Sequence, residues 1–218
     1  MLLYYITDRK SFGGNEADQR AALLRCVAKA ARAGLDYIQL REKDLNPADA
    51  ELLARQARHL VRENSAHTKF LISTHAEIAL SVGADGVHLP AKASPVASVR
   101  EYWLRESGHE PVIGVSVHTM SEVQQAQLAG ARFAVLAPIF EKVAPHGIGI
   151  GLDALREACC RGGIPVLALG GVSLANAGSC LDAGAAGVAG VRLFQQGNVS
   201  ETVRALRDLA KNSQQPTS

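Results

Sequence analysis

Two glycine-containing segments near the C-terminal end of the chain have the composition of an anion-binding site. Gly170 and Gly171 precede a predicted helix, and Gly190 and Val191 lead into Arg192 beside them. Glycine leaves backbone N–H groups open to a ligand, and amides at the start of a helix favour a phosphate. Arg192 can add a charged fork of hydrogen bonds. The alternative is that both segments are tight turns in which glycine only relieves crowding.

A second candidate anion site consists of Gln39, Arg41 and Lys43, which alternate along a predicted strand. Alternate residues of a strand share one face. Cations that face the mouth of a fold cost desolvation energy unless an anion meets them. The pattern therefore predicts that these side chains bind a second phosphate or a pyrophosphate. The alternative is an ion pair within the protein, with Asp8 or Glu42 as the partner.

Three histidines, His75, His88 and His118, lie at the ends of three successive apolar runs. Three imidazoles can hold Zn²⁺ with one open position, or each histidine can pack and hydrogen-bond separately. A single one can also act as a general acid or base, because imidazole titrates near neutral pH. Glu141, at the end of a later run, is a further candidate for proton transfer. Ser116 has no adjacent base in the sequence, so we expect it to act as a hydrogen-bond donor rather than a nucleophile.

These residues belong to a repeated unit in which a helical end is followed by glycine, one or two small residues and an apolar strand. The repeated glycines are Gly34, Gly83, Gly130 and Gly184, which are 49, 47 and 54 residues apart. Glycine suits the left-handed residue that ends a helix. A period near 50 residues has room for two strand–helix units, so four copies predict eight. The sequence therefore predicts a (βα)₈ TIM barrel, whose functional residues gather at the C-terminal ends of the strands.

Alternating strands and helices can be placed along the whole chain. Apolar runs predict strands at 3–7, 37–40, 70–74, 86–89, 112–116, 133–136, 166–170 and 187–191. The plainest helices are at 18–32, 48–63, 121–129 and 200–211, with Ser200 as the N-cap of the last. We expect a single barrel domain over 1–211 and a disordered polar tail over 212–218. The loop 141–151, which is rich in glycine, is expected to be mobile.

Composition narrows the functional class. The chain has 218 residues, of which 47% are hydrophobic and 20% charged, and its net charge is +2. These values predict no nucleic-acid partner, and the lack of an apolar run of about 18 residues predicts no membrane partner. The four cysteines lack metal-ligand spacing, and Cys26 and Cys180 are expected to be buried thiols. We expect a cytoplasmic protein, and a homo-oligomer is compatible with the sequence.

The motifs taken together resemble those of thiamine phosphate synthases and of the related TenI-type thiazole tautomerases. They follow strands one to eight in order, and they are Tyr5-Ile-Thr-Asp8, Gln39-Leu-Arg-Glu-Lys43, Ala84-Asp-Gly-Val-His-Leu89, Gly114-Val-Ser-Val-His-Thr119, Pro138-Ile-Phe140, Gly170-Gly-Val172 and Gly184-Ala-Ala-Gly-Val-Ala189. The synthase joins an aminopyrimidine methyl pyrophosphate to a thiazole phosphate with the help of Mg²⁺. The resemblance implies that Gln39, Arg41 and Lys43 contact the pyrophosphate and that Ser116 lies near the pyrimidine. It also implies that Gly171 and the turn 190–192 hold the thiazole phosphate.

Three departures from the family pattern concern the reaction. Where the family has two metal-binding aspartates, this chain has Thr74 and Ala93, so the hard oxygen ligands of Mg²⁺ are missing and no cofactor is expected. Lys92 adds a cation nearby. The Phe-x-Thr-x-Thr-Lys clamp is replaced by the segment 140–145, and the histidine of the tautomerases falls at Pro138. A tautomerase would then have to recruit His75, His88 or Glu141 for proton transfer.

From these features we expect a divergent member of this family that binds a small phosphorylated thiamine precursor. Metal-independent isomerase chemistry of the tautomerase kind is slightly preferred, because it needs only an acid and a base across a bound phosphate. The alternatives are the Mg²⁺-dependent synthase reaction and a non-catalytic binding or regulatory protein.

Overall fold

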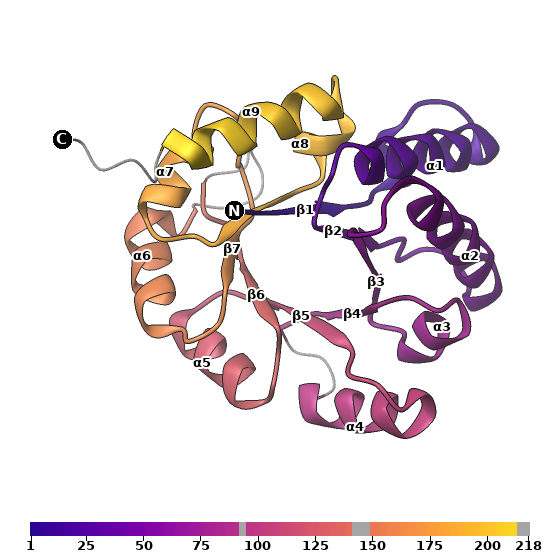
Figure 1. Cartoon of the computed structure of the whole chain (residues 1–218), viewed down its shortest axis with the longest axis horizontal. Coiled ribbons are helices and arrows are strands. Elements are labelled where there is room, and N and C mark those ends of the chain that lie inside the picture. The colour runs from indigo at the N-terminus through magenta and orange to yellow at the C-terminus, as the bar shows by residue number, and fades with distance from the viewer. Residues whose placement is uncertain (92–94, 141–148, 213–218) are drawn as a thin grey trace.

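Eight parallel strands form a closed barrel in the computed structural model, which describes residues 1–91, 95–140 and 149–212 (Figure 1). The strands pair in chain order, and β1 closes the ring by pairing with β8 through Leu3 and Val188. Their bounds are β1 Leu2–Ile6, β2 Tyr37–Leu40, β3 Lys69–Ser73, β4 Gly86–Leu89, β5 Val112–Val117, β6 Phe133–Leu136, β7 Val166–Ala168 and β8 Gly187–Gly190. The predicted TIM barrel is confirmed, and each predicted strand agrees with the observed one to within two residues at either end.

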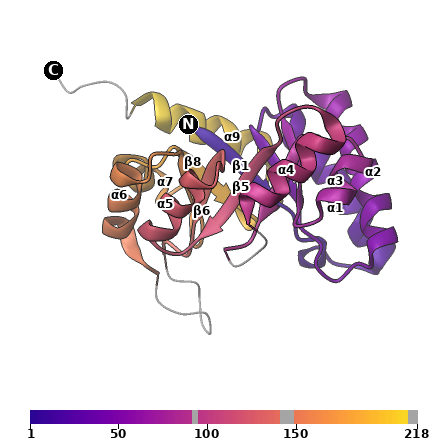
Figure 2. The same cartoon turned by 90° about the horizontal axis from the view of Figure 1, so that it is seen from below.

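Helices surround the barrel and bury the outer faces of its strands (Figures 1 and 2). In chain order they are α1 Glu16–Arg32, α2 Pro47–Asn64, α3 Ala76–Ser81, α4 Val96–Ser107, α5 Met120–Leu128, α6 Gly151–Arg161, α7 Ala177–Asp182, α8 Arg192–Gln195 and α9 Val199–Asn212, with a 3₁₀ turn, η1, at Arg9–Ser11. Figure 2 shows the N-terminal strand passing beside α9. No helix in the described part of the chain is long and apolar enough to cross a membrane.

The joints between helix and strand depend on glycine, as the repeat predicted. Gly34, Gly83, Gly130 and Gly184 have φ values of +84°, +65°, +91° and +92°. Other residues rarely adopt this left-handed conformation, so glycine ends each helix and allows the chain to enter the next strand at once. The joints therefore direct each following strand into the barrel.

The predicted N-cap of the last helix is wrong, and the predicted C-terminal end of that helix is one residue short. Helix α9 begins at Val199, and the side chain of Asn198 accepts hydrogen bonds from the N–H groups of Ser200 and Glu201. Asn198 is therefore the N-cap of the helix, since it stands one position before the first helical residue. Asparagine caps helices as well as serine does. The helix also includes Asn212, which was assigned to the tail. The rest of the predicted tail, 213–218, lies outside the described residues.

Inside the barrel, side chains from most of the strands fill the axis. Tyr4 is fully buried and contacts Phe133 edge to face, with ring centroids 5.4 Å apart. The apolar residues of this inner cluster are Tyr4, Ile6, Leu71, Phe133, Val135, Leu167 and Ala189. Polar Gln39 and His88 join them, with exposed fractions of 1% and 4%. The interior is thus a packed core that carries polar groups toward the barrel mouth.

Candidate functional site

A pocket with a volume of about 760 Å³ lies at the C-terminal ends of β7 and β8. Its lining brings the two glycine turns together, as the sequence predicted, through Gly170, Gly171, Gly190, Val191 and Arg192. Asp8 and Ser11 also line it, from the end of β1. A pocket of this size at this end of a barrel is where phosphorylated ligands are commonly bound.

Backbone geometry makes this pocket suitable for an anion. Gly170 and Gly171 have φ values of +95° and +68°, and a Cβ on Gly170 would stand 2.7 Å from the Cα of Pro138. Among the described residues, the N–H groups of Gly171, Arg192 and Leu193 have no hydrogen-bond acceptor. The Arg192 side chain is exposed and has no ion-pair partner there either. These donors can bind phosphate oxygens. The alternative, that glycine only relieves crowding in tight turns, explains Gly170 but not the free amides.

Glu42, in the loop after β2, forms a buried ion pair with Arg9 of η1. Its side chain is 2% exposed and accepts hydrogen bonds from the Thr7 hydroxyl at 2.6 Å and from the Arg9 guanidinium at 3.2 Å. Arg9 also pairs with Asp44 at 2.7 Å and with Glu16 at 2.8 Å. Burial raises the pKa of Glu42, and the bonds from Thr7 and Arg9 oppose that change. Glu42 is therefore a structural group.

Arg41 is left without a protein partner in the described part of the chain. No ion pair or side-chain hydrogen bond joins it to Asp8 or Glu42, and its backbone N–H is held by the Thr7 hydroxyl at 2.9 Å. Its guanidinium lies close enough to His88 to lower the pKa of that imidazole. Lys43 is exposed and likewise unpaired within the same residues. The predicted internal ion pair is thus absent for Arg41, whereas the contact of Arg41 and Lys43 with an anionic ligand stays a prediction.

A chain of four polar side chains runs from the barrel interior to its mouth. The Tyr4 hydroxyl lies 3.2 Å from Gln39 Oε1 and 3.1 Å from His88 Nδ1. His88 Nε2 in turn lies 2.9 Å from the Oγ of Ser116, which is half-buried. Burial lowers the pKa of His88 to about 3, with Arg41 adding to the shift, so the imidazole is neutral at physiological pH. Gln39 lies below the mouth in this chain, and its predicted contact with substrate stays a prediction.

The other two histidines of the predicted trio lie in different surroundings. His75 is exposed and precedes α3, without a side-chain hydrogen bond. His118 is also exposed, and its Nδ1 lies 2.7 Å from the backbone oxygen of Ala137. In the described ranges no group of three His, Cys, Asp or Glu side chains could hold a metal ion. The described residues therefore support separate histidines rather than the zinc alternative.

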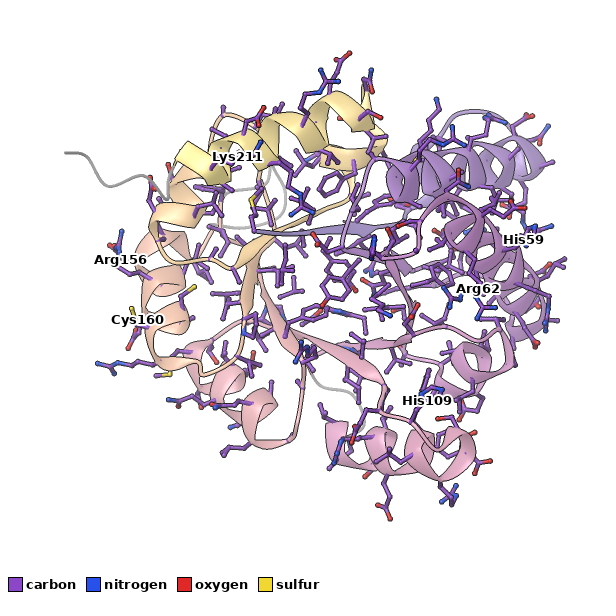
Figure 3. The ribbon with its side chains drawn as sticks, viewed as in Figure 1. His59, Arg62, His109, Arg156, Cys160 and Lys211 are labelled. Atoms are coloured by element: carbon purple, nitrogen blue, oxygen red, sulfur yellow. The ribbon has the colours of Figure 1, made fainter. Side chains whose placement is uncertain are left out.

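Several other residues with ionisable or nucleophilic side chains lie away from the barrel mouth. Figure 3 labels six such side chains on the layer of helices and loops around the barrel, and they are His59, Arg62, His109, Arg156, Cys160 and Lys211. Cys26 and Cys180 are free thiols, and Cys180 is buried as the sequence predicted, whereas Cys26 is half-buried. Glu141, the fourth predicted catalytic residue, lies outside the described residues, as does most of the loop 141–151.

The end of β3, where the family carries a metal-binding aspartate, has a strained threonine. Thr74 has a φ of +74°, which is rare for a β-branched residue, and its N–H donates to the backbone oxygen of His88. Its hydroxyl and that of Ser73 are neutral, and Mg²⁺ prefers carboxylates. The second aspartate position, Ala93, lies outside the described residues, and alanine has no donor atom in its side chain. The residues that replace the family's ligands therefore do not fit Mg²⁺.

Two functional candidates were not found from the sequence. Tyr4 was treated as an ordinary strand residue, although its hydroxyl joins Gln39 to His88 across 35 and 84 positions of the chain. Asp8 is not among the predicted substrate-binding residues, yet it lines the pocket at β7 and β8. The signal for Asp8 was its position at a strand end. No local pattern marks Tyr4.

Comparisons with known proteins agree with the fold and with the motifs. The family described as thiamine monophosphate synthase matches residues 3–194. Thiamine-phosphate synthase of Roseiflexus sp. is 36% identical over 190 residues, covering 86% of this chain and 75% of the relative. That of Methanoculleus marisnigri is 34% identical over 209 residues, covering 94% and 93%.

A solved structure is similar over almost the whole molecule. Thiamine phosphate pyrophosphorylase from Pyrococcus furiosus superimposes with a TM-score of 0.80 at 27% identity, covering 98% of this chain and 97% of the other. 3-Hexulose-6-phosphate synthase, at 19% identity and a TM-score of 0.68, shares the barrel fold alone. The family match spans all eight strands, so this chain belongs to the thiamine monophosphate synthase family of thiamine biosynthesis.

Proposed function

We propose that this protein joins two phosphorylated precursors of thiamine, a thiazole phosphate and an aminopyrimidine methyl pyrophosphate. The observation that carries the proposal is the presence of two separate groups of anion-binding donors around one barrel mouth, neither of which has a partner among the described residues. One is the β7–β8 pocket with its free amides and Arg192, and the other is Arg41 with Lys43 after β2. A reaction between two anionic substrates accounts for both, whereas a one-substrate isomerase accounts for one.

The first site suits the thiazole phosphate. Amides of Gly171, Arg192 and Leu193 surround a volume that accommodates a small phosphorylated heterocycle. Backbone amides of a fixed turn need no reorganisation when the anion arrives, and they bind without any metal. Arg192 adds a charge at the solvent side. The relatives named thiamine-phosphate synthase support this assignment.

The second site suits the leaving group of the coupling reaction. The thiazole nitrogen would attack the methylene carbon of the pyrimidine, forming a C–N bond while the C–O bond to pyrophosphate breaks. The pyrophosphate leaves with the bonding electron pair, so negative charge grows on its bridging oxygen. Arg41 and Lys43 are cations without a described protein partner, and they would stabilise this charge. No step is assigned to Mg²⁺, because the residues at its family site do not fit it.

Isomerisation of a thiazole phosphate is the second candidate. It is favoured by the replacement of the family's carboxylate by Thr74, since proton transfer needs no metal. Against it, the histidine that contacts Ser116, His88, is buried and neutral with a pKa of about 3, so it is a weak base. Proton transfer would then depend on His75, His118 or Glu141.

The test is product analysis with each precursor alone and with both together, with and without EDTA. Thiamine phosphate formed only from the pair, and pyrophosphate released in equal amount, would support the coupling reaction. A change of the thiazole phosphate in the absence of the pyrimidine would establish the isomerase instead. Calorimetric binding of both precursors with no turnover in either assay would mean that the protein is a non-catalytic binder.

A further inference from the structure

Tyr4 is linked through His88 to Ser116, and through this link it can control the hydrogen bond that Ser116 offers to a ligand. The four-residue chain Gln39–Tyr4–His88–Ser116 has three contacts of 3.2, 3.1 and 2.9 Å. Tyr4 is fully buried, and Gln39 and His88 are at least 96% buried. None of the three can exchange its partner for water without rearranging the barrel interior. The direction in which protons are donated along this chain is therefore a fixed property of the fold.

Counting donors determines that direction. Tyr4 has one hydroxyl proton and lies between Gln39 Oε1, which can only accept, and His88 Nδ1, which can do either. With the carbonyl of Gln39 facing it, Tyr4 donates to Gln39 and its oxygen is left to accept from Nδ1–H. A neutral imidazole carries one proton, so Nε2 is then the acceptor. The hydroxyl of Ser116 must therefore donate to Nε2.

We propose that Tyr4 is a positioning residue that holds His88 as the Nδ1–H tautomer, so that Ser116 donates inward and offers only its lone pairs to the ligand. Ser116 would then recognise a hydrogen-bond donor, such as the exocyclic amine of an aminopyrimidine. The sequence predicts Ser116 to be a hydrogen-bond donor; under this proposal its proton goes to His88 and not to the ligand. The ligand part of this inference rests on the proposed function, while the tautomer is a property of the free protein.

The tautomer can be measured by long-range ¹H–¹⁵N NMR of the labelled protein, with the His88 signals assigned by their loss in His88→Gln. We expect the Nδ1–H form in the wild type. In Tyr4→Phe, Nδ1 has no acceptor and no donor, so the proton should move to Nε2 and point at Ser116. Gln39→Leu should cause the same change, because the Tyr4 hydroxyl is then free to donate to Nδ1. An Nε2–H tautomer in the wild type would overturn the proposal.

Tyr5→Phe is the matched control. Tyr5 is also on β1 and fully buried, but it faces outward, with its ring 6.3 Å from that of Phe194. Loss of its hydroxyl should leave the His88 tautomer unchanged. A tautomer change in this variant equal to that in Tyr4→Phe would show that any loss of a β1 hydroxyl disturbs the barrel, and would refute the specific role of Tyr4.

Binding provides the second readout. Tyr4→Phe should weaken the binding of aminopyrimidine methyl pyrophosphate about tenfold, as for one lost hydrogen bond, and leave the binding of inorganic pyrophosphate unchanged. Equal losses for both probes, or none for either, would refute the role of Ser116 as an acceptor. If neither probe binds the wild type, the proposed function fails, and the NMR result still decides the role of Tyr4.

Discussion

Replacement of Arg41 by alanine separates ligand binding from folding on the basic segment after β2. Arg41 has no ion pair in the described residues, and its neighbour Glu42 is already satisfied by Thr7 and Arg9. Its removal therefore leaves no buried carboxylate unpaired. We expect the free energy of unfolding to stay within about 0.5 kcal/mol of the wild type. The affinity for a pyrophosphate ligand should fall by about 1.5–3 kcal/mol, or roughly 10- to 150-fold, as for a lost charge-assisted hydrogen bond.

Arg9→Met is the matched control, because it removes the same charge from the same end of the barrel. Arg9 is 2% exposed and contacts three carboxylates, of which Glu42 is also buried. Truncating one partner of a buried pair leaves the other charge uncompensated, which costs about 3–5 kcal/mol. Arg9→Met should thus lose stability, although Arg9 is not part of either anion site.

Urea unfolding of both variants gives the stability change, and calorimetric titration with inorganic pyrophosphate and aminopyrimidine methyl pyrophosphate gives the affinity. Wild-type affinity in Arg41→Ala, together with a stability loss like that of Arg9→Met, would refute the reasoning. Arg41 would then be a structural cation whose partner lies outside the described residues.

Four further results are expected. Between pH 8 and pH 5.5 the free energy of unfolding should fall by about 1.4 kcal/mol through His88, because the unfolded chain takes up a proton near pH 6.5 while the buried imidazole, with a pKa of about 3, does not. Urea unfolding of His88→Gln should lack this component, and a pH slope equal to that of the wild type would contradict it. Removal of Mg²⁺ with EDTA should leave turnover unchanged. Thr74→Asn should raise the free energy of unfolding by about 1 kcal/mol in thermal unfolding, since asparagine tolerates a φ of +74°. Arg192→Gln should weaken the binding of inorganic phosphate about tenfold without lowering the melting temperature, because Arg192 is exposed and unpaired in the described chain; unchanged phosphate affinity would place the anion elsewhere.

The fold was predictable because its signals are local. Each repeated glycine, such as Gly34 or Gly184, marks a left-handed helix end that only the backbone at that point requires. Apolar strand runs and their spacing then imply closure of eight units. The cap of α9 was misassigned because Asn198 and Ser200 are both good capping residues two positions apart, and propensity cannot separate them.

The candidate site was predictable only where backbone position sufficed. Gly171 and Arg192 could be placed together because the ends of β7 and β8 must be adjacent in a barrel. The partner of Glu42 could not be found in this way, since Arg9 lies 33 residues earlier and reaches it by its side chain. The link from Tyr4 to His88 spans 84 residues and depends on which side chains fill the barrel axis.

The segment after β2 shows why a charge count cannot locate an anion site. Residues 41–44 read Arg, Glu, Lys, Asp, so their formal charges cancel, and the anion site was predicted here from the alternation of Gln39, Arg41 and Lys43 on one strand face rather than from net charge. The fold separates these charges: Arg9 and Lys10 bind the two carboxylates from η1, with Arg9 on both and Lys10 on Asp44 at 3.0 Å. The two cations of the segment stay unpaired in the described chain. A short turn after β1 thus converts a neutral segment into a positive one, and an anionic substrate is the partner that this arrangement leaves open.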